Sequence, residues 1–458
     1  MQYRLRISGK HHERLASHLF PGDGKEAVAV ALCGHHTNGG SHYLLVHDIY
    51  CIPYHVCERS ADYVNWKTES IIPILEKGAK KKLSFIKIHS HPTGYDQFSM
   101  IDDKSDKMLF PSVYGWIDGD QAHGSVVMLP GGKLFGRIVD KNASFHPIEK
   151  IAVVGDLIRI WDLKSVSVDA ALSKRNIQAF GMGTTKLLKG MKIGVVGASG
   201  TGSPTIEQLA RLGAGELVII DPKLVEKRNL NRILNTNSRH VENHEFKVDV
   251  IADCIGSIGF GTKVYVFKEN LYDSREAILA LISCDIIFGC VDSIDGRHLL
   301  NQISTFYLIP LIDMGVKLEA DDLGGIRQIN GAVHYIQPGG SSLMTRGVYK
   351  MKGLEAAGLM RQDPEEYERR SHEKYIVNLP VESPAVISVN MQTSSYAINE
   401  FLDRIHPFKG TDPKDRAAIW LSISEDMIFT EQDGTPDSFL EKRVGRGDIK
   451  PFLEMPEL

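Results

Sequence analysis

Several features that would narrow the function of this 458-residue chain are scarce or absent. Its six cysteines include no C-x-x-C pair, which fits reduced thiols in a cytoplasm. No apolar run reaches the roughly 18 residues that a membrane-spanning helix needs, and the N-terminal stretch lacks the apolar core of a signal peptide. The formal net charge of −4 gives no reason to expect a nucleic-acid partner. We therefore expect a cytoplasmic protein that binds neither nucleic acid nor a membrane.

Length and composition indicate a folded protein with more than one domain. Hydrophobic residues make up 43% of the chain and charged residues 24%, as in globular proteins. A chain of 458 residues is too long for one ordinary core, so two domains with additional segments are expected. In the first part, short apolar strands at 27–32, 43–46, 85–88, 125–129 and 134–139 give an α/β pattern.

A strand at 193–196, a glycine-rich turn and an amphipathic helix at 205–212 follow one another near the middle of the chain. Backbone amides at such a helix start can approach a phosphate closely because glycine has no Cβ, and the helix dipole favours the anion. The next strand, 216–220, ends in Asp221, whose carboxylate can accept hydrogen bonds from a ribose. We therefore expect a nucleotide site whose loop glycines are Gly197, Gly200 and Gly202.

Four polar residues after Asp221 favour a triphosphate over a dinucleotide. A dehydrogenase that binds NAD uses the acid but does not need further cations and a second acid downstream. An enzyme that handles a triphosphate needs both, because cations neutralise phosphate oxygens and an acid at the end of a strand can hold magnesium. The four residues are Asn229, Arg232, Lys247 and Asp292.

With the glycine loop and these residues in this order, the stretch from about 172 to 405 resembles the ThiF/MoeB family of adenylating enzymes, which are related to ubiquitin-activating enzymes. The resemblance implies that ATP and Mg²⁺ are used to adenylate the C-terminus of a ubiquitin-like or ThiS-like β-grasp protein. It also implies that Arg175 reaches the nucleotide bound in the other protomer of a homodimer. Many members carry an acceptor cysteine on a crossover segment, but this chain has no cysteine from Gly315 to Ala385.

A second group of polar residues lies in the first part of the chain, at the end of a predicted strand. Residues i and i+2 of a strand point to the same face, so His89 and His91 can bind one ion. Asp102 adds an oxygen ligand and leaves the fourth tetrahedral position for water, as in catalytic zinc sites. Bound zinc lowers the pKa of water to about 7, and Ser99 would donate a hydrogen bond to the oxyanion that forms when a carbonyl is attacked. These residues predict zinc-dependent hydrolysis of an amide or isopeptide bond.

The same stretch, IHSHPTGYDQFSMIDDKSD at residues 88–106, resembles the JAMM (JAB/MPN) metalloprotease motif: H-x-H, seven residues, then S-x-x-D. The similarity covers about residues 15 to 160. The motif requires an upstream acid, and the resemblance implies that Glu26 is this acid and the general base, because Glu26 opens a strongly apolar strand ending in Cys-Gly. Among other glutamates, Glu58, Glu69 and Glu76 also precede the motif. Asp103 and Asp106 do not fit its spacing and are expected to be solvent-exposed turn residues.

These patterns predict an α/β protein in which a JAMM-type metalloprotease domain at 1–162 precedes a Rossmann-like, ThiF-like domain at 163–405. A crossover segment at 337–384 is too charged to form a core, and residues 406–458 form a C-terminal extension. The piece at 151–163 is interpreted either as a closing strand of the first domain or as a connecting segment.

Three functions remain open at this point. The first is a bifunctional enzyme that hydrolyses a peptide or isopeptide bond at the C-terminus of a β-grasp protein and adenylates that terminus. The second is a JAMM peptidase whose nucleotide-binding domain regulates or scaffolds, which the missing crossover cysteine favours, as does Lys223 where relatives often have a second acid. The third, a dinucleotide oxidoreductase, is disfavoured because no hydride-transfer site is recognisable.

Overall fold

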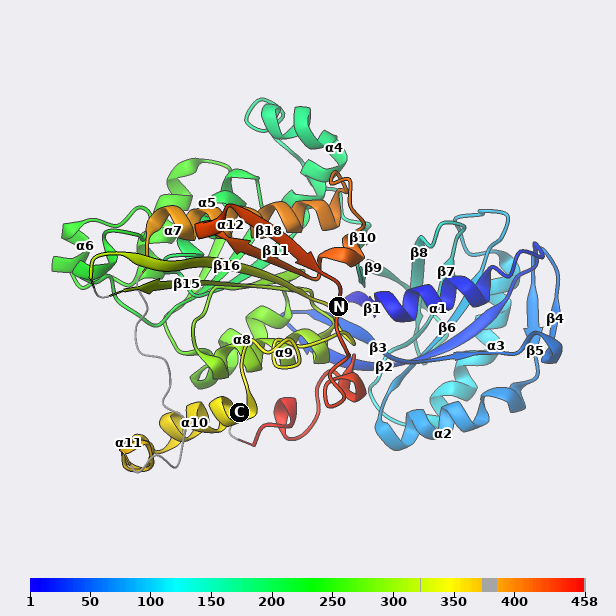
Figure 1. The fold of residues 1–458 in the computed structure, drawn as a ribbon. Helices are drawn as coiled ribbons and strands as arrows, with labels where there is room; N and C mark the ends of the chain where they lie inside the picture. The colour runs from blue at the N-terminus through cyan, green and yellow to red at the C-terminus, as the bar shows by residue number, and fades with distance from the viewer. Residues whose placement is uncertain (322, 373–384, 457–458) are drawn as a thin grey trace. The chain divides into compact units, whose positions relative to one another are not determined.

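The computed structural model describes residues 1–321, 323–372 and 385–456 (Figure 1). These residues form two compact units. Unit 1 contains Met1–Ser165, Thr305–Leu308 and Lys442–Pro456. Unit 2 contains Val166–Ser304 and Ile309–Glu441. Within the described ranges, no helix is both long and apolar enough to cross a membrane.

Unit 1 is built on an eight-stranded sheet with the order β1-β3-β2-β6-β7-β8-β9-β10. Strand β9 also pairs in parallel with β1, so the sheet closes on itself and is barrel-like. The segment at 151–163, whose role the sequence left open, belongs to β9 and β10 of this sheet. The strands are β1 (Gln2–Ser8), β2 (Val28–Asn38), β3 (Ser41–Cys51), β6 (Ser84–Ser90), β7 (His123–Met128), β8 (Leu134–Val139), β9 (Phe145–Val154) and β10 (Ile158–Asp162).

Helices cover this sheet because its central strands are apolar on both faces. Every residue of β6 is buried, and one core cluster lies on each side of β2 and β6. The helices are α1 (Gly9–Leu19), α2 (Ile72–Lys81) and α3 (Met100–Trp116). A separate two-stranded sheet pairs β4 (Cys57–Arg59) with β5 (Val64–Trp66).

The C-terminal segment Lys442–Pro456 belongs to unit 1 and lies against β2. The backbone N–H of Gly34 donates to the Gly445 carbonyl (3.2 Å), and the N–H of Asp448 donates to the His35 carbonyl (2.9 Å). A Cβ on Gly34 would lie 2.3 Å from the Gly445 oxygen, so this approach requires glycine. The Asp448 carboxylate accepts hydrogen bonds from His36 Nδ1 (3.0 Å) and from the Tyr307 hydroxyl (2.8 Å).

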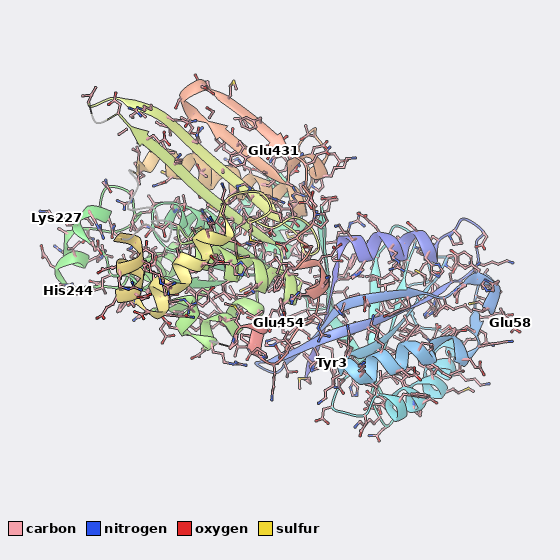
Figure 2. All side chains as sticks on the ribbon, turned by 60° about the horizontal axis from the view of Figure 1, so that its bottom comes forward. Tyr3, Glu58, Lys227, His244, Glu431 and Glu454 are labelled. Carbon is pink, nitrogen blue, oxygen red and sulfur yellow. The ribbon has the colours of Figure 1, made fainter. Side chains whose placement is uncertain are left out.

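Unit 2 contains a second eight-stranded sheet with the order β13-β12-β11-β14-β15-β16-β17-β18. Its first five strands are parallel, in the 3-2-1-4-5 order of a Rossmann-like fold, which confirms the predicted fold of this part. The remaining strands are antiparallel, and Glu431 ends the exposed edge strand β18 (Figure 2). The strands are β11 (Lys192–Val196), β12 (Glu216–Ile220), β13 (Lys263–Phe267), β14 (Ile286–Gly289), β15 (Leu311–Ala320), β16 (Ile326–Ile336), β17 (Ala418–Ser422) and β18 (Met427–Glu431).

Several helices flank this second sheet, and α12 packs against both α5 and β15. The polar crossover segment at 337–384 contains two further helices, α10 (Met351–Gln362) and α11 (Pro364–His372). Its last residues, 373–384, lie outside the described residues. On α10, the Arg361 guanidinium lies over the Tyr272 ring (3.9 Å) and 3.7 Å from Asp295. The other helices include α4 (Lys174–Gly190), α5 (Gly202–Arg211), α7 (Lys247–Ile258), α8 (Arg275–Ile282), α9 (Ile294–Tyr307) and α12 (Ile387–Ile405).

Candidate functional site

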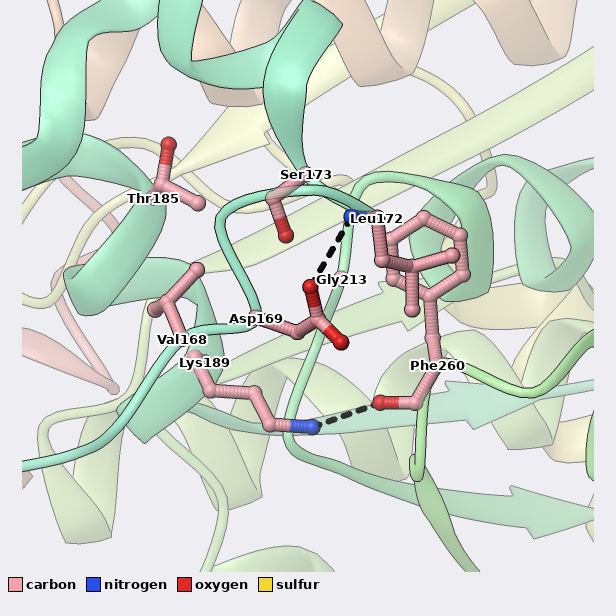
Figure 3. Close-up of a pocket in the computed structure, with 8 residues that line it drawn as sticks. All are labelled: Val168, Asp169, Leu172, Ser173, Thr185, Lys189, Gly213 and Phe260. Carbon is pink, nitrogen blue, oxygen red and sulfur yellow. Dashed lines mark hydrogen bonds between the residues drawn. The ribbon is translucent and has the colours of Figure 1, made fainter.

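One pocket of unit 2 contains none of the residues that the sequence predicts for a site (Figure 3). Its two charged side chains are engaged with backbone groups: Lys189 donates to the Phe260 carbonyl (2.8 Å), and Asp169 accepts from the Leu172 N–H (3.0 Å). These two hydrogen bonds hold the segment around the pocket in place. The residues predicted for a functional site lie elsewhere.

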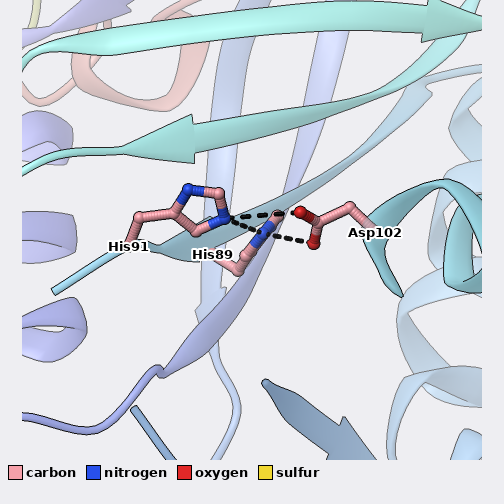
Figure 4. A group of neighbouring side chains, drawn as sticks. All are labelled: His89, His91 and Asp102. Atoms are coloured by element: carbon pink, nitrogen blue, oxygen red, sulfur yellow. Dashed lines mark hydrogen bonds and ion pairs between the residues drawn. The ribbon is translucent and has the colours of Figure 1, made fainter. Parts of the chain in front are cut away.

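In unit 1, the three predicted zinc ligands converge (Figure 4). His89 is near the end of β6, His91 follows directly after that strand, and Asp102 comes from the first turn of α3. His89 Nε2 lies 2.8 Å from Asp102 Oδ1, and His91 Nε2 lies 3.4 Å from Asp102 Oδ2. The two Nε2 atoms are 3.2 Å apart. All three side chains are buried.

These separations fit one zinc ion. Ligand atoms about 2.0–2.1 Å from a tetrahedral zinc lie about 3.3 Å from one another, close to the distances observed here. His91 Nδ1 is 2.7 Å from the Tyr95 carbonyl, so Nδ1 carries the proton and the Nε2 lone pair faces the cluster. Burial acts to raise the pKa of Asp102, but the hydrogen bonds from His89 and His91 outweigh it and hold that pKa far below its usual range. The carboxylate is therefore ionised, as a metal ligand must be.

Glu26 lies beside this cluster, just before β2. It is 4% exposed, and its Oε1 is 3.9 Å from His91 Nε2. Burial raises the pKa of Glu26 to about 8. A bound cation would lower that pKa again and favour the base form. Glu26 lines a pocket with Lys87, His89 and Asp102.

The three alternative glutamates named from the sequence are exposed: Glu58 (Figure 2), Glu69 and Glu76. None of them lines the pocket around His89. Their exposure favours Glu26 as the acid next to the cluster.

Ser99 is the N-cap of α3. Its hydroxyl accepts from the Asp102 N–H (3.1 Å) and its own backbone N–H donates to Asp102 Oδ2 (2.7 Å), which completes a capping box. The hydroxyl also donates to Asp102 Oδ2 (2.7 Å). In this arrangement Ser99 orients a candidate ligand. Its predicted contact with a substrate oxyanion stays a prediction.

The expectation that Asp106 is a solvent-exposed turn residue is wrong. It is 0% exposed, contacts Lys87 Nζ, and accepts a hydrogen bond from Arg137 Nη2 (2.7 Å). The reason is helical periodicity, since Asp106 lies four residues after Asp102 and so on the same face of α3. Asp103 is more exposed and pairs with Arg137. Lys87 belongs to no motif in the sequence, but its position two residues before His89 on the same strand could have indicated its place near the cluster.

In unit 2, the glycine loop joins β11 to α5. Gly197 has φ +94°, a conformation that L side chains rarely adopt. A Cβ on Gly202 would lie 1.9 Å from the Gly197 carbonyl, so the turn can close only with glycine at this position. One short glycine loop thus connects the end of a parallel strand to the start of α5, where helix amides can meet an anion.

The predicted acid and lysine lie at this loop. Asp221 Oδ2 accepts a hydrogen bond from the Ala198 N–H (2.8 Å), and Oδ1 accepts one from the Lys223 N–H (2.9 Å). Lys247 begins α7, is buried, and donates from Nζ to Ser199 Oγ (3.0 Å). Burial lowers the pKa of Lys247, while the charge of Asp221 acts in the opposite direction.

The remaining predicted residues are Arg232, Asn229, Asp292 and Arg175. Arg232 lies close to Gly200, since a Cβ on Gly200 would be 3.5 Å from Arg232 Cδ. Asn229 accepts from the Glu226 N–H (3.1 Å) in a capping box, a local role that sequence reasoning did not foresee. Asp292 is exposed and follows β14 at the carboxyl ends of the parallel strands. Arg175 is exposed on α4 and donates to Gln178 Oε1 (3.1 Å), and its action on a second protomer stays a prediction.

Comparison with known proteins gives one family match and several relatives. The model of the ThiF family matches residues 173–376. Ubiquitin-like modifier-activating enzyme 5 of Culex quinquefasciatus is 26% identical over 195 residues, which cover 40% of this chain and 46% of that protein. Adenylyltransferase and sulfurtransferase MOCS3 of Caenorhabditis briggsae is 29% identical over 136 residues, which cover 30% of this chain and 33% of that protein.

The chain therefore spans between about a third and a half of the length of these curated relatives. Among solved structures, E. coli MccB with succinimide is 14% identical with a TM-score of 0.45, and the match covers 58% of this chain and 73% of that one. The matched family residues contain the glycine loop, Asp221, Lys247 and Asp292. Residues 173–376 of this chain form a ThiF family domain.

Proposed function

We propose that this chain is a bifunctional enzyme that acts on the C-terminus of a ubiquitin-like β-grasp protein. One activity adenylates the C-terminal carboxylate with ATP, and the other hydrolyses a peptide or isopeptide bond at that terminus with zinc. The single observation that carries the proposal is that one chain holds a ThiF family domain and, in unit 1, a buried His89–His91–Asp102 cluster beside Glu26.

The adenylation step is supported by the family match and by the cations around the glycine loop. A carboxylate oxygen of the partner protein attacks the α-phosphorus of ATP, the bond to the β-phosphate oxygen breaks, and pyrophosphate leaves. Lys247 and Arg232 neutralise the charge that develops on the phosphates, and Asp292 would hold Mg²⁺. The names of two relatives, an activating enzyme for a ubiquitin-like modifier and an adenylyltransferase, agree with this chemistry.

The hydrolytic step is supported by the geometry in unit 1 and by the resemblance of residues 88–106 to the JAMM motif. His89, His91 and Asp102 would hold zinc, which when bound acidifies a water molecule and polarises a carbonyl. Glu26 takes a proton from the attacking water and gives it to the leaving amine. The burial of Glu26 beside His91 supports this role.

A second candidate function treats unit 2 as a nucleotide-binding scaffold that does not adenylate. Two observations favour it: no cysteine occurs from Gly315 to Ala385, and Lys223 stands two residues after Asp221. Exchange of radiolabelled pyrophosphate into ATP, measured with candidate β-grasp proteins, separates the two functions. Exchange that depends on the partner protein means adenylation, whereas ATP binding without exchange supports the scaffold.

The zinc site gives a direct prediction. Purified protein should hold about one zinc per chain, and the double variant His89→Ala/His91→Ala should hold none, because two of its three protein ligands are gone. Elemental analysis measures both. The control is His12→Ala, which removes another buried histidine of unit 1. Undiminished zinc in the double variant would place the ion elsewhere.

Activation should stop at the acyl-adenylate or pass directly to an outside nucleophile, without a thioester on the crossover segment, which has no cysteine from Gly315 to Ala385. Burial raises the pKa of the Cys290 thiol to about 12, and Cys284 is fully buried, so neither supplies a reactive thiolate. Enzyme, ATP and partner are run on gels with and without reductant. An adduct that reductant removes and that one Cys→Ala variant abolishes would contradict this prediction.

A further inference from the structure

Asn390, on the first turns of α12, has a buried side chain whose amide nitrogen is unsatisfied. The residue is 3% exposed, and its Nδ2 has no hydrogen-bond partner among the described residues. Buried amide groups in folded proteins nearly always have a partner, so an orphan of this kind calls for an explanation. A ligand that is absent from the structure is one such explanation.

The side chain points at the glycine loop. A Cβ on Gly200 would lie 2.4 Å from Asn390 Nδ2 and 3.5 Å from Arg232 Cδ, so the amide and the guanidinium stem meet at the same face of this glycine. On the neighbouring residue, Ser199 accepts the hydrogen bond from Lys247 Nζ (3.0 Å). Asn390 and Lys247 therefore bring donors to the turn between β11 and α5 from two separate helices. The stem of Arg232 lies beside them, while its Nη1 donates to the Arg228 carbonyl (2.8 Å).

Resting on the proposed use of ATP, we propose that Asn390 donates a hydrogen bond from Nδ2 to a phosphate oxygen of the nucleotide held at this loop. A phosphate oxygen is a strong acceptor, and a hydrogen bond to a charged group is roughly twice as strong as one between neutral groups. Because Gly200 has no side chain, Asn390 Nδ2 can come close to the backbone of the loop. Asn390 is thus a side-chain donor at the loop in addition to Lys247, supplied by a helix that enters the fold about 150 residues later in the sequence.

A neighbour on the same helix provides a matched control. Thr393 is 0% exposed, and its Oγ1 also has no partner among the described residues. It faces a different part of unit 2, since a Cβ on Gly331 of β16 would lie 2.5 Å from Thr393 Oγ1. Thr393→Val keeps the shape of the side chain and removes only this second unpaired polar atom, Oγ1.

The test measures ATP, ADP and adenosine binding by calorimetry to the full-length wild type, Asn390→Ala, Asn390→Asp and Thr393→Val. Asn390→Ala should weaken ATP binding by roughly 10-fold or more. Asn390→Asp should weaken it further, because a carboxylate of the same size would face the phosphates. Adenosine binding should change less than twofold in both, and Thr393→Val should bind ATP as the wild type does.

Each outcome has a distinct meaning. A wild type that does not bind ATP overturns the proposed function. A wild type that binds ATP, with Asn390→Ala binding equally well, overturns only the role of Asn390. Equal losses for ATP and adenosine also overturn it, because they indicate a purely structural effect. Asn390→Ser serves in place of Asn390→Ala if that variant does not fold, with the same expected loss.

Discussion

Replacing Glu26 with Gln is expected to lower the hydrolysis of a β-grasp conjugate by roughly 10²- to 10⁴-fold, while zinc stays bound. The amide of Gln has nearly the same size as the carboxylate but cannot accept a proton from water. The side chain lies 3.9 Å from His91 Nε2, close to the cluster without being one of its three ligands. Turnover of a fluorogenic ubiquitin-like substrate and elemental analysis of the same preparation measure the two quantities.

Glu58→Gln is the control for this variant, because Glu58 precedes the same motif but is exposed on β4. It should hydrolyse the substrate at the wild-type rate. Near-normal turnover by Glu26→Gln would assign the general base to another acid, and loss of zinc from that variant would make Glu26 a ligand.

The second large effect is expected for Asp292→Asn, which should lower partner-dependent pyrophosphate exchange by roughly 10²- to 10³-fold. Asp292 follows β14 at the edge of the sheet where the parallel strands end, and its carboxylate would hold Mg²⁺ on the phosphates. The neutral amide of Asn binds this cation far less well. Because Asp292 is exposed, the substitution should leave the stability of unit 2 nearly unchanged.

Asp253→Asn tests whether the loss of any surface acid has the same effect. Asp253 is exposed on α7, within the same unit. This variant should exchange pyrophosphate at the wild-type rate. Normal exchange by Asp292→Asn at low magnesium concentration would show that the metal is held by other groups.

Local patterns predicted the parts of the fold that local interactions determine. Strand β12 has the predicted bounds of 216–220, and the helix predicted at 205–212 is α5. His89 and His91 converge with Asp102 because strand alternation and a helix cap position these side chains, which lie at most 13 residues apart in the sequence. Such short-range geometry can be obtained from spacing alone.

Contacts between distant segments were not predictable in this way. No spacing rule places Asn390 beside Gly200, because the approach depends on how α12 packs against α5. The closure of the barrel-like sheet by β1 and β9 likewise joins residues about 145 positions apart. Helical periodicity puts Asp106 on the same face of α3 as Asp102, but its ion-pair partners Lys87 and Arg137 lie on β6 and β8, and no local pattern indicated them.

The C-terminal segment that packs against β2 has a consequence for synthesis. The strands of unit 1 have all been synthesised by residue 165, but residues 442–456 follow only after about 280 more residues. At roughly 5–20 residues per second, the early strands wait about 15 to 55 seconds for the backbone of Gly445 and Asp448. During that interval, the edge of β2 at Gly34 and His35 is open to solvent and to chaperones. A fragment that ends at residue 165 lacks both Thr305–Leu308 and this C-terminal segment, so it should stay in the unfinished state.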